Sequence, residues 1–253
     1  MTAALAAVFL TAADSDLTRG EPAQGVRAID GAVFTLDSGE LARLAAVHAP
    51  LGREALADDA RAALQALIGD QPLLLRYDEE RRDRRDRILA QIYVAPDGEG
   101  GADSAPLWIQ GAMLERGLAR VETTARNAAM AAEMLALEAK ARTARRGLWA
   151  RPEYAVRAPD PATLAQELDT FQIVEGVVVG AAETDDFAYL NFGLDYLTDF
   201  TVSIAARDLD EIREAGLEPL DLEGARVRVR GYLHAVNGPM IDVTHAEQIE
   251  VLE

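Results

Sequence analysis

Hydrophobic and polar positions in the first half of the chain predict short strands followed by a helix. The residues from Gly25 to Ile29, from Val33 to Leu36 and from Glu40 to Val47 have the short period and turn boundaries of strands. Residues 54–68 change to helical spacing, which places their leucines and Ala60 on one stripe.

Two more strands and two more helices complete this part of the pattern. Residues 72–77 and 88–94 have strand character and flank a charged hairpin, residues 78–87. Helices are predicted over about 107–116 and 125–146, and each is followed by a glycine, the usual residue after a helix end. Short strands with inserted helices predict an α+β, mainly β unit over residues 25–150. We expect a barrel of the oligonucleotide/oligosaccharide-binding (OB) type.

A second strand-rich unit is predicted over residues 171–253. A segment with three prolines, residues 151–170, precedes it and predicts a linker. Asn237-Gly238 is a strong hairpin signal, and residues 207–215 favour a helix after the third strand. The same arrangement of strands and helix predicts a second OB-like barrel. Its strands are expected at 174–179, 187–192, 200–204, 225–233 and 240–243.

Charge changes what these barrels are expected to bind. The chain of 253 residues has 43 acidic and 25 basic side chains, a net charge of −18. From Thr170 onward there are 17 acidic and 5 basic residues, so −12 of this charge belongs to the second unit. Proteins bind phosphate backbones mainly through basic side chains. Because acidic residues predominate in this chain, weak or no nucleic-acid binding is expected. Arg226, Arg228 and Arg230 alternate onto one strand face, where pairing with neighbouring acids is favoured over a binding stripe.

Residues 1–24 are expected to form an N-terminal arm or the remnant of a signal segment. Ala3 to Ala13 is an apolar run with small residues near its end, as in a signal peptide, but it lacks a positive n-region. A start upstream would favour a periplasmic or extracellular location. No segment reaches the roughly 20 apolar residues of a membrane span. The absence of cysteine excludes disulfides and thiolate metal sites.

Six short blocks carry a family resemblance. In this order and spacing they resemble the thermonuclease (staphylococcal-nuclease-like) family over most of residues 25–149. The residues after about 189 resemble, more weakly, an OB-like extension of some bacterial thermonuclease-like proteins. The six blocks are Ala28-Ile29-Asp30-Gly31, Arg43-Leu44 with Val47-His48-Ala49-Pro50, Gly52-Arg53-Glu54-Ala55, Asp83 to Ala90, Leu114 to Val121, and Glu138 to Arg142 with Gly147-Leu148-Trp149.

The resemblance implies calcium-dependent hydrolysis of phosphodiesters, but the acids for that chemistry are missing. The family holds calcium with aspartates, activates water with a glutamate and stabilises the phosphoryl charge with two arginines. In this sequence the two aspartate positions hold Ala32 and His48, and the glutamate position holds Leu51. The arginine positions are kept as Arg43 and Arg87.

These substitutions predict a catalytically degenerate nuclease without a metal or other cofactor. Arg43 and Arg87, the family's catalytic arginines, would line an anion pocket for phosphate, and the acidic barrel would serve an unidentified protein partner. The other interpretation of the two arginines is a pair of structural salt bridges, with Asp83 and Asp86 as the expected partners.

Other hypotheses stay open at this stage. The chain would be an active metal-dependent phosphodiesterase if calcium were held by a rearranged carboxylate set around Asp30, Asp37 or Glu54. A third hypothesis makes both barrels structural parts of a larger assembly. His48 would bind zinc only with further ligands nearby, so a hydrogen bond to a neighbouring residue is favoured for it.

Overall fold

The structure, a computed structural model of the chain, describes residues 17–69, 71–95 and 106–252. The chain divides into two compact units between Arg151 and Pro152. The apolar run near the N-terminus lies outside the described residues, as does most of the glycine-rich loop after residue 95.

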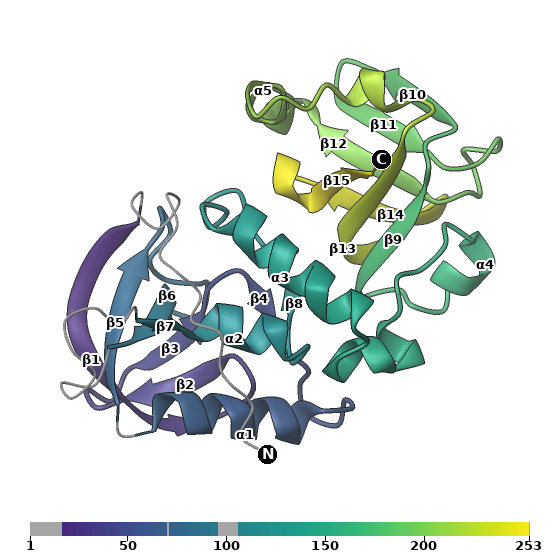
Figure 1. Cartoon of the computed structure of the whole chain (residues 1–253). Helices are drawn as coiled ribbons and strands as arrows, with labels where there is room; N and C mark the ends of the chain where they lie inside the picture. The colour runs from purple at the N-terminus through teal and green to yellow at the C-terminus, as the bar shows by residue number, and fades with distance from the viewer. Residues whose placement is uncertain (1–16, 70, 96–105, 253) are drawn as a thin grey trace. The chain divides into compact units, whose positions relative to one another are not determined.

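The first unit is a closed five-stranded barrel (Figure 1). Strand β1 pairs with β2 on one side and with β5 on the other. Strand β2 pairs with β3, β5 pairs with β6, and the parallel pairing of β3 with β6 closes the ring. This order is that of an OB barrel, as the sequence predicts. The strands are β1 (Thr18–Ala28), β2 (Val33–Leu36), β3 (Leu41–Leu44), β5 (Pro72–Tyr77) and β6 (Ile88–Val94).

Helices and three short strands complete the first unit. Helix α1 begins after Leu56, which has a φ of 65°, so the helix starts three residues later than its pattern predicts. The predicted stop at Gly117 is confirmed, because α2 ends just before it and its φ is a left-handed 67°. The helix predicted over 125–146 is shorter than expected: α3 begins at Ala131 and ends at Thr143, and Gly147 is the first residue of the next helical turn. The helices are α1 (Ala57–Ile68), α2 (Ile109–Glu115), α3 (Ala131–Thr143) and η2 (Gly147–Ala150), and the short strands are β4 (Val47–His48), β7 (Leu107–Trp108) and β8 (Arg120–Val121).

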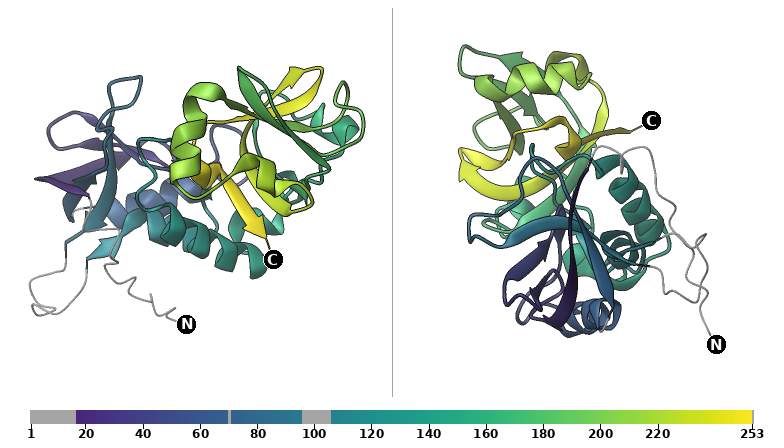
Figure 2. Two further views of the ribbon diagram at one scale, coloured as in Figure 1. Left: turned by 90° about the horizontal axis from the view of Figure 1, so that it is seen from above. Right: turned by 90° about the vertical axis from the view of Figure 1, so that its left-hand side faces the viewer.

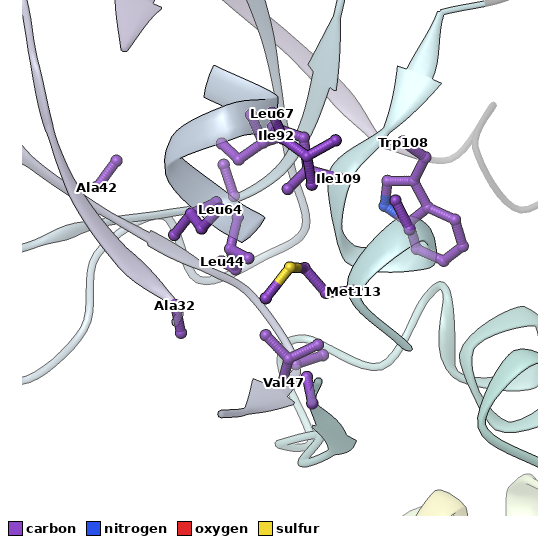
Figure 3. Packing of buried hydrophobic residues seen from close by; sticks show 14 of the residues in the cluster. Ala32, Ala42, Leu44, Val47, Leu64, Leu67, Ile92, Trp108, Ile109 and Met113 are labelled. Carbon is purple, nitrogen blue, oxygen red and sulfur yellow. The ribbon is translucent and has the colours of Figure 1, made fainter. Parts of the chain in front are cut away.

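One hydrophobic core fills this barrel (Figure 3). Leu64 of α1, Leu44 of β3, Ile92 of β6 and Met113 of α2 are fully buried and converge on it. Strand β6 is buried along almost its whole length, and Ile88, Ala90 and Ile92, which share one face of it, all belong to this cluster. Ala32 belongs to the same cluster, with only 5% of its surface exposed.

The second unit is a curled sheet that also follows the OB order, and Figure 2 shows it from two further directions. Strand β12 pairs in parallel with β14, and β14 pairs with β13. Strand β9 pairs with β13, whereas its continuation β10 pairs with β11 at the other end of the sheet. The strands are β9 (Phe171–Val177), β10 (Gly180–Glu183), β11 (Phe187–Asn191), β12 (Thr201–Ala205), β13 (Arg226–Val236), β14 (Gly238–Val243) and β15 (Ile249–Leu252).

The helical segments of the second unit are short. Helix α5 (Ala206–Glu214) follows the third predicted strand, as expected, and the hairpin at Asn237 joins β13 to β14. Strands β10 and β15 have no counterpart among the predicted strands. The remaining segments are η3 (Pro152–Tyr154), α4 (Pro161–Leu164), η4 (Pro219–Leu222) and η5 (Ala246–Gln248).

Residues 152–170, for which the prolines predict a linker, fold onto the second unit. Leu164 is fully buried in its core. The backbone of Arg157 forms hydrogen bonds with Ile173 and Glu175, and its guanidinium is 2.7 Å from Glu167. These contacts with the second unit show that the segment is packed and is not the free linker that its prolines predict.

Candidate functional site

A carboxylate that the sequence does not single out, Glu122, joins two of the predicted site residues. Strand β4 pairs with β8, which places His48 opposite Arg120 and brings Glu122 close to β4. Arg43 Nη2 donates to Glu122 Oε2 over 3.2 Å, and His48 Nδ1 lies 3.3 Å from the same oxygen. The hydrogen bond expected for His48 is therefore confirmed, and its partner is Glu122.

Arg87 forms a separate and closer ion pair with Asp83. Its Nε and Nη2 atoms lie 2.7 Å and 2.6 Å from Asp83 Oδ2, and both side chains are at most 15% exposed. Burial raises the pKa of Asp83, but hydrogen bonds from the side chain and backbone of Arg87 and from the backbone of Arg85 outweigh it, so the pKa lies below its usual value. The expected pairing with Asp83 is confirmed, whereas Asp86 lies 3.5 Å from Arg82.

Arg43 lies on β3, and Arg87 directly precedes the neighbouring strand β6. The parallel register of β3 and β6 aligns Arg43 with Leu89, two residues after Arg87. Arg43 forms its hydrogen bonds through Nη2 alone, and Arg87 through Nε and Nη2. Within the described residues, the Nη1 group of each arginine has no hydrogen-bond partner. Each guanidinium therefore keeps a donor for an anion.

The three positions at which the resemblance expects acids provide no carboxylate. The Ala32 side chain packs in the core cluster, and His48 is held by Glu122. Leu51 is 46% exposed in the loop before α1. An apolar core position and an aliphatic loop side chain provide no oxygen ligand for calcium.

Two of the acids considered as substitutes are occupied by backbone contacts. Asp30 Oδ1 accepts from the N–H groups of Ala32 and Val33 over 2.7 and 2.8 Å. Asp37 Oδ1 accepts from those of Gln24 and Ser38. In the part of the chain that the structure describes, no three histidine, aspartate or glutamate side chains are grouped so as to hold a metal ion.

The closed barrel and the order of its elements agree with a comparison to known families. A family model described as staphylococcal nuclease homologue matches residues 41–151. Residues 41–151 of the first unit therefore form a staphylococcal-nuclease-like domain. The matched range of this thermonuclease-like domain includes Arg43, Glu122 and Arg87, whereas Ala32 lies before it. No curated protein matches the chain.

The sequence holds one weak signal for Glu122. It follows Arg120-Val121, the end of a block that carries the thermonuclease resemblance, but nothing local ties it to Arg43, which lies 79 residues earlier. The role of Glu122 becomes visible only once strand β4 is paired with β8.

Among the described residues, no helix of this protein has both the length and the apolar character to cross a membrane.

The basic stripe of the second unit is a paired face, as the sequence favours. Arg228 of β13 lies opposite Glu175 of β9 and Glu250 of β15, with nitrogen–oxygen distances of 2.6 and 3.2 Å. Arg226 binds the same Glu175, and Arg230 binds Glu250, each over 2.6 Å. These two carboxylates pair with all three arginines and offset two of their three positive charges.

Proposed function

We propose that the first unit is a thermonuclease-family domain without metal-dependent hydrolysis, which keeps Arg43 and Arg87 as a weak pocket for phosphate-like anions. The observation that carries this proposal is the position of Glu122. The carboxylate that reaches Arg43 is paired with that arginine and with His48. The family's own acid positions hold Ala32, His48 and Leu51.

The chemistry of calcium supports the loss of hydrolysis. Calcium takes about six to eight oxygen ligands at roughly 2.3–2.6 Å. A single carboxylate beside a guanidinium and an imidazole offers two such oxygens and a repelling positive charge. Losing one preorganised electrostatic group typically costs about 10²–10³ in rate, and losing a general base about 10²–10⁴. A protein without either retains little of a family-like rate.

The arginines support anion binding, but only of modest strength. An anion that binds Arg43 and Arg87 through their remaining donors competes with Glu122 and Asp83, which are already in place. Both carboxylates are part of the same chain, so their effective concentration is high. Phosphate binding should therefore be weak and sensitive to salt.

We assign the second unit a binding role that does not depend on nucleic acid. It carries most of the negative charge of the chain, and each arginine of its basic stripe is paired with Glu175 or Glu250. Such a surface repels phosphate backbones and favours other partners.

Hydrolysis of DNA and RNA by the purified protein, with calcium and with chelator, tests the loss of activity. We expect no calcium-dependent cleavage. Cleavage that needs calcium and disappears in Arg43→Gln, with an unchanged circular-dichroism spectrum, would show that other carboxylates form an active metal site. Arg53→Gln, an exposed arginine in the same unit, is the matched control.

Titration with inorganic phosphate tests the pocket separately. We expect weak binding at low salt that Arg43→Gln reduces and Arg53→Gln does not change. Equal binding by the natural protein and both variants would remove the pocket from the proposal and leave the loss of hydrolysis standing.

A further inference from the structure

A cleft of about 630 Å³ lies on the outer face of the second unit. Strands β11, β12 and β14 form its floor, and the end of β13 and the hairpin at Asn237 border it. This volume lies within the usual range for small-molecule sites, roughly 300–1,000 Å³. Neither the domain match nor the arginine site extends to it.

The strand register arranges its side chains in two rows. Tyr189, Ser203 and Asp242 are register partners across β11, β12 and β14. The second row runs from Asn191 through Thr201 and Met240 to His234 of β13. The residues between them, such as Leu190 and Val202, point into the core. The alternation of the strands therefore places a continuous polar and aromatic surface on the outside.

Aromatic rings form one end of this surface. Phe187 and Tyr189 are successive outward residues of β11, and their ring centroids lie 5.8 Å apart with planes tilted by 31°. Tyr196, in the loop after β11, is 65% exposed and also lines the cleft. Exposed aromatic rings offer flat apolar faces for a ligand to stack on.

The floor has hydrogen-bonding groups of both kinds. Thr201 and Ser203 are buried and donate to Asn191 Oδ1 and Asp242 Oδ1 respectively. His234 Nε2 lies 3.1 Å from the same Asp242 oxygen. The hydroxyl groups of Thr201 and Ser203 orient the side chains of Asn191 and Asp242, whose Nδ2 and Oδ2 atoms have no hydrogen-bond partner in the described part of the chain. The site thus offers a donor and an acceptor a short distance from aromatic faces.

Charge restricts the ligand further. None of the described residues that line the cleft is a lysine or an arginine. Residues 170–253, which include all of these strands, have a net charge of −12. Phosphate-bearing ligands need cations to offset their charge, so neither a nucleotide nor a nucleic-acid strand suits this surface.

We propose that this cleft binds a neutral carbohydrate, whose apolar ring face stacks on Tyr189 and Phe187 while its hydroxyl groups bond to Asn191, Asp242 and Asn237. A sugar presents both features at once, since its C–H groups lie on the ring faces and its hydroxyls on the rim. The inference rests on the binding role proposed for the second unit and is independent of nuclease chemistry in the first.

A glycan array probed with the full chain, followed by calorimetry with the neutral oligosaccharides retained, tests this inference. We expect binding to neutral glycans that Tyr189→Ala weakens about tenfold or more. Tyr232→Ala is the matched control, because Tyr232 is a half-exposed tyrosine of the same unit outside the cleft. Phe187→Ala, at an exposed position, provides a second variant if Tyr189→Ala unfolds.

Two other probes separate this inference from the binding role itself. The sugar assignment is overturned if the protein binds no neutral glycan on the array. It is also overturned if neither Tyr189→Ala nor Phe187→Ala changes the binding. A lysine-rich peptide that binds in its place, and loses affinity in Tyr189→Ala, keeps the binding role and replaces the ligand class. Binding of a thymidine hexanucleotide at this cleft contradicts the charge argument and overturns both.

Discussion

His48 Nδ1 and Glu122 Oε2 lie 3.3 Å apart, which joins strand β4 to the residue that follows β8. The same carboxylate oxygen is 3.2 Å from Arg43 Nη2, so one acid serves two neighbours. Substituting Glu122 therefore changes both the charge and the availability of the retained arginine.

We expect Glu122→Gln to strengthen the binding of inorganic phosphate several-fold at low salt. The substitution removes a negative charge next to Arg43 and frees Nη2 for an external anion. Calorimetric titration at two salt concentrations measures the effect. Glu115→Gln, which removes an acid that lies beside Arg146, serves as the control for net charge. Weaker phosphate binding in Glu122→Gln would show that Arg43 needs Glu122 to hold its position.

Restoring calcium binding should depend on which position is changed. His48→Asp with Leu51→Glu adds two carboxylates to Glu122, so we expect measurable calcium affinity by terbium luminescence or calorimetry. Adding Ala32→Asp places a charged group at a position packed in the core and should lower the free energy of unfolding by about 1–3 kcal/mol without calcium. Urea unfolding of both variants compares them, and equal stability would mean that residue 32 reaches solvent.

The Arg87–Asp83 pair should stabilise the first unit in a pH-dependent way. Asp83 has a lowered pKa in the folded protein, so its contribution is present above its ordinary value of 3.8 and is lost as the pH falls through the folded value. We expect Asp83→Asn to cost about 1–3 kcal/mol at neutral pH and progressively less below pH 3.8. Urea unfolding at several pH values measures this. Asp59→Asn, an exposed position of α1, should show a small effect without that trend.

Buried His245 should weaken the second unit in mild acid. Burial lowers its pKa from 6.5 to about 4, so the folded state keeps it neutral while the unfolded state takes up a proton. Stability is therefore lost as the pH falls from 6.5 towards 4, with a slope of at most about 1.4 kcal/mol per pH unit. We expect His245→Asn to reduce this slope, measured by thermal or urea unfolding. His234→Asn, at a partly exposed position, is the comparison.

Local pattern determined most of the regular structure of this protein. Strands β2, β5 and β6 have the predicted bounds, because short apolar runs flanked by turn residues mark where each of them begins and ends. The absence of acidic side chains at residues 32, 48 and 51 is also a property of the sequence alone. The turn-forming Asn237-Gly238 likewise predicted its hairpin, since few residues tolerate the left-handed conformation that such turns need.

Tertiary structure alone decided which groups meet. Glu122 reaches Arg43 and His48 only because β4 pairs with β8, and Leu164 joins the second core although its surroundings predict a linker. The two rows of the cleft depend on the register of four strands, which no single segment specifies. Contacts between residues many positions apart follow from how the barrels close, and barrel closure depends on burying all of the strands together.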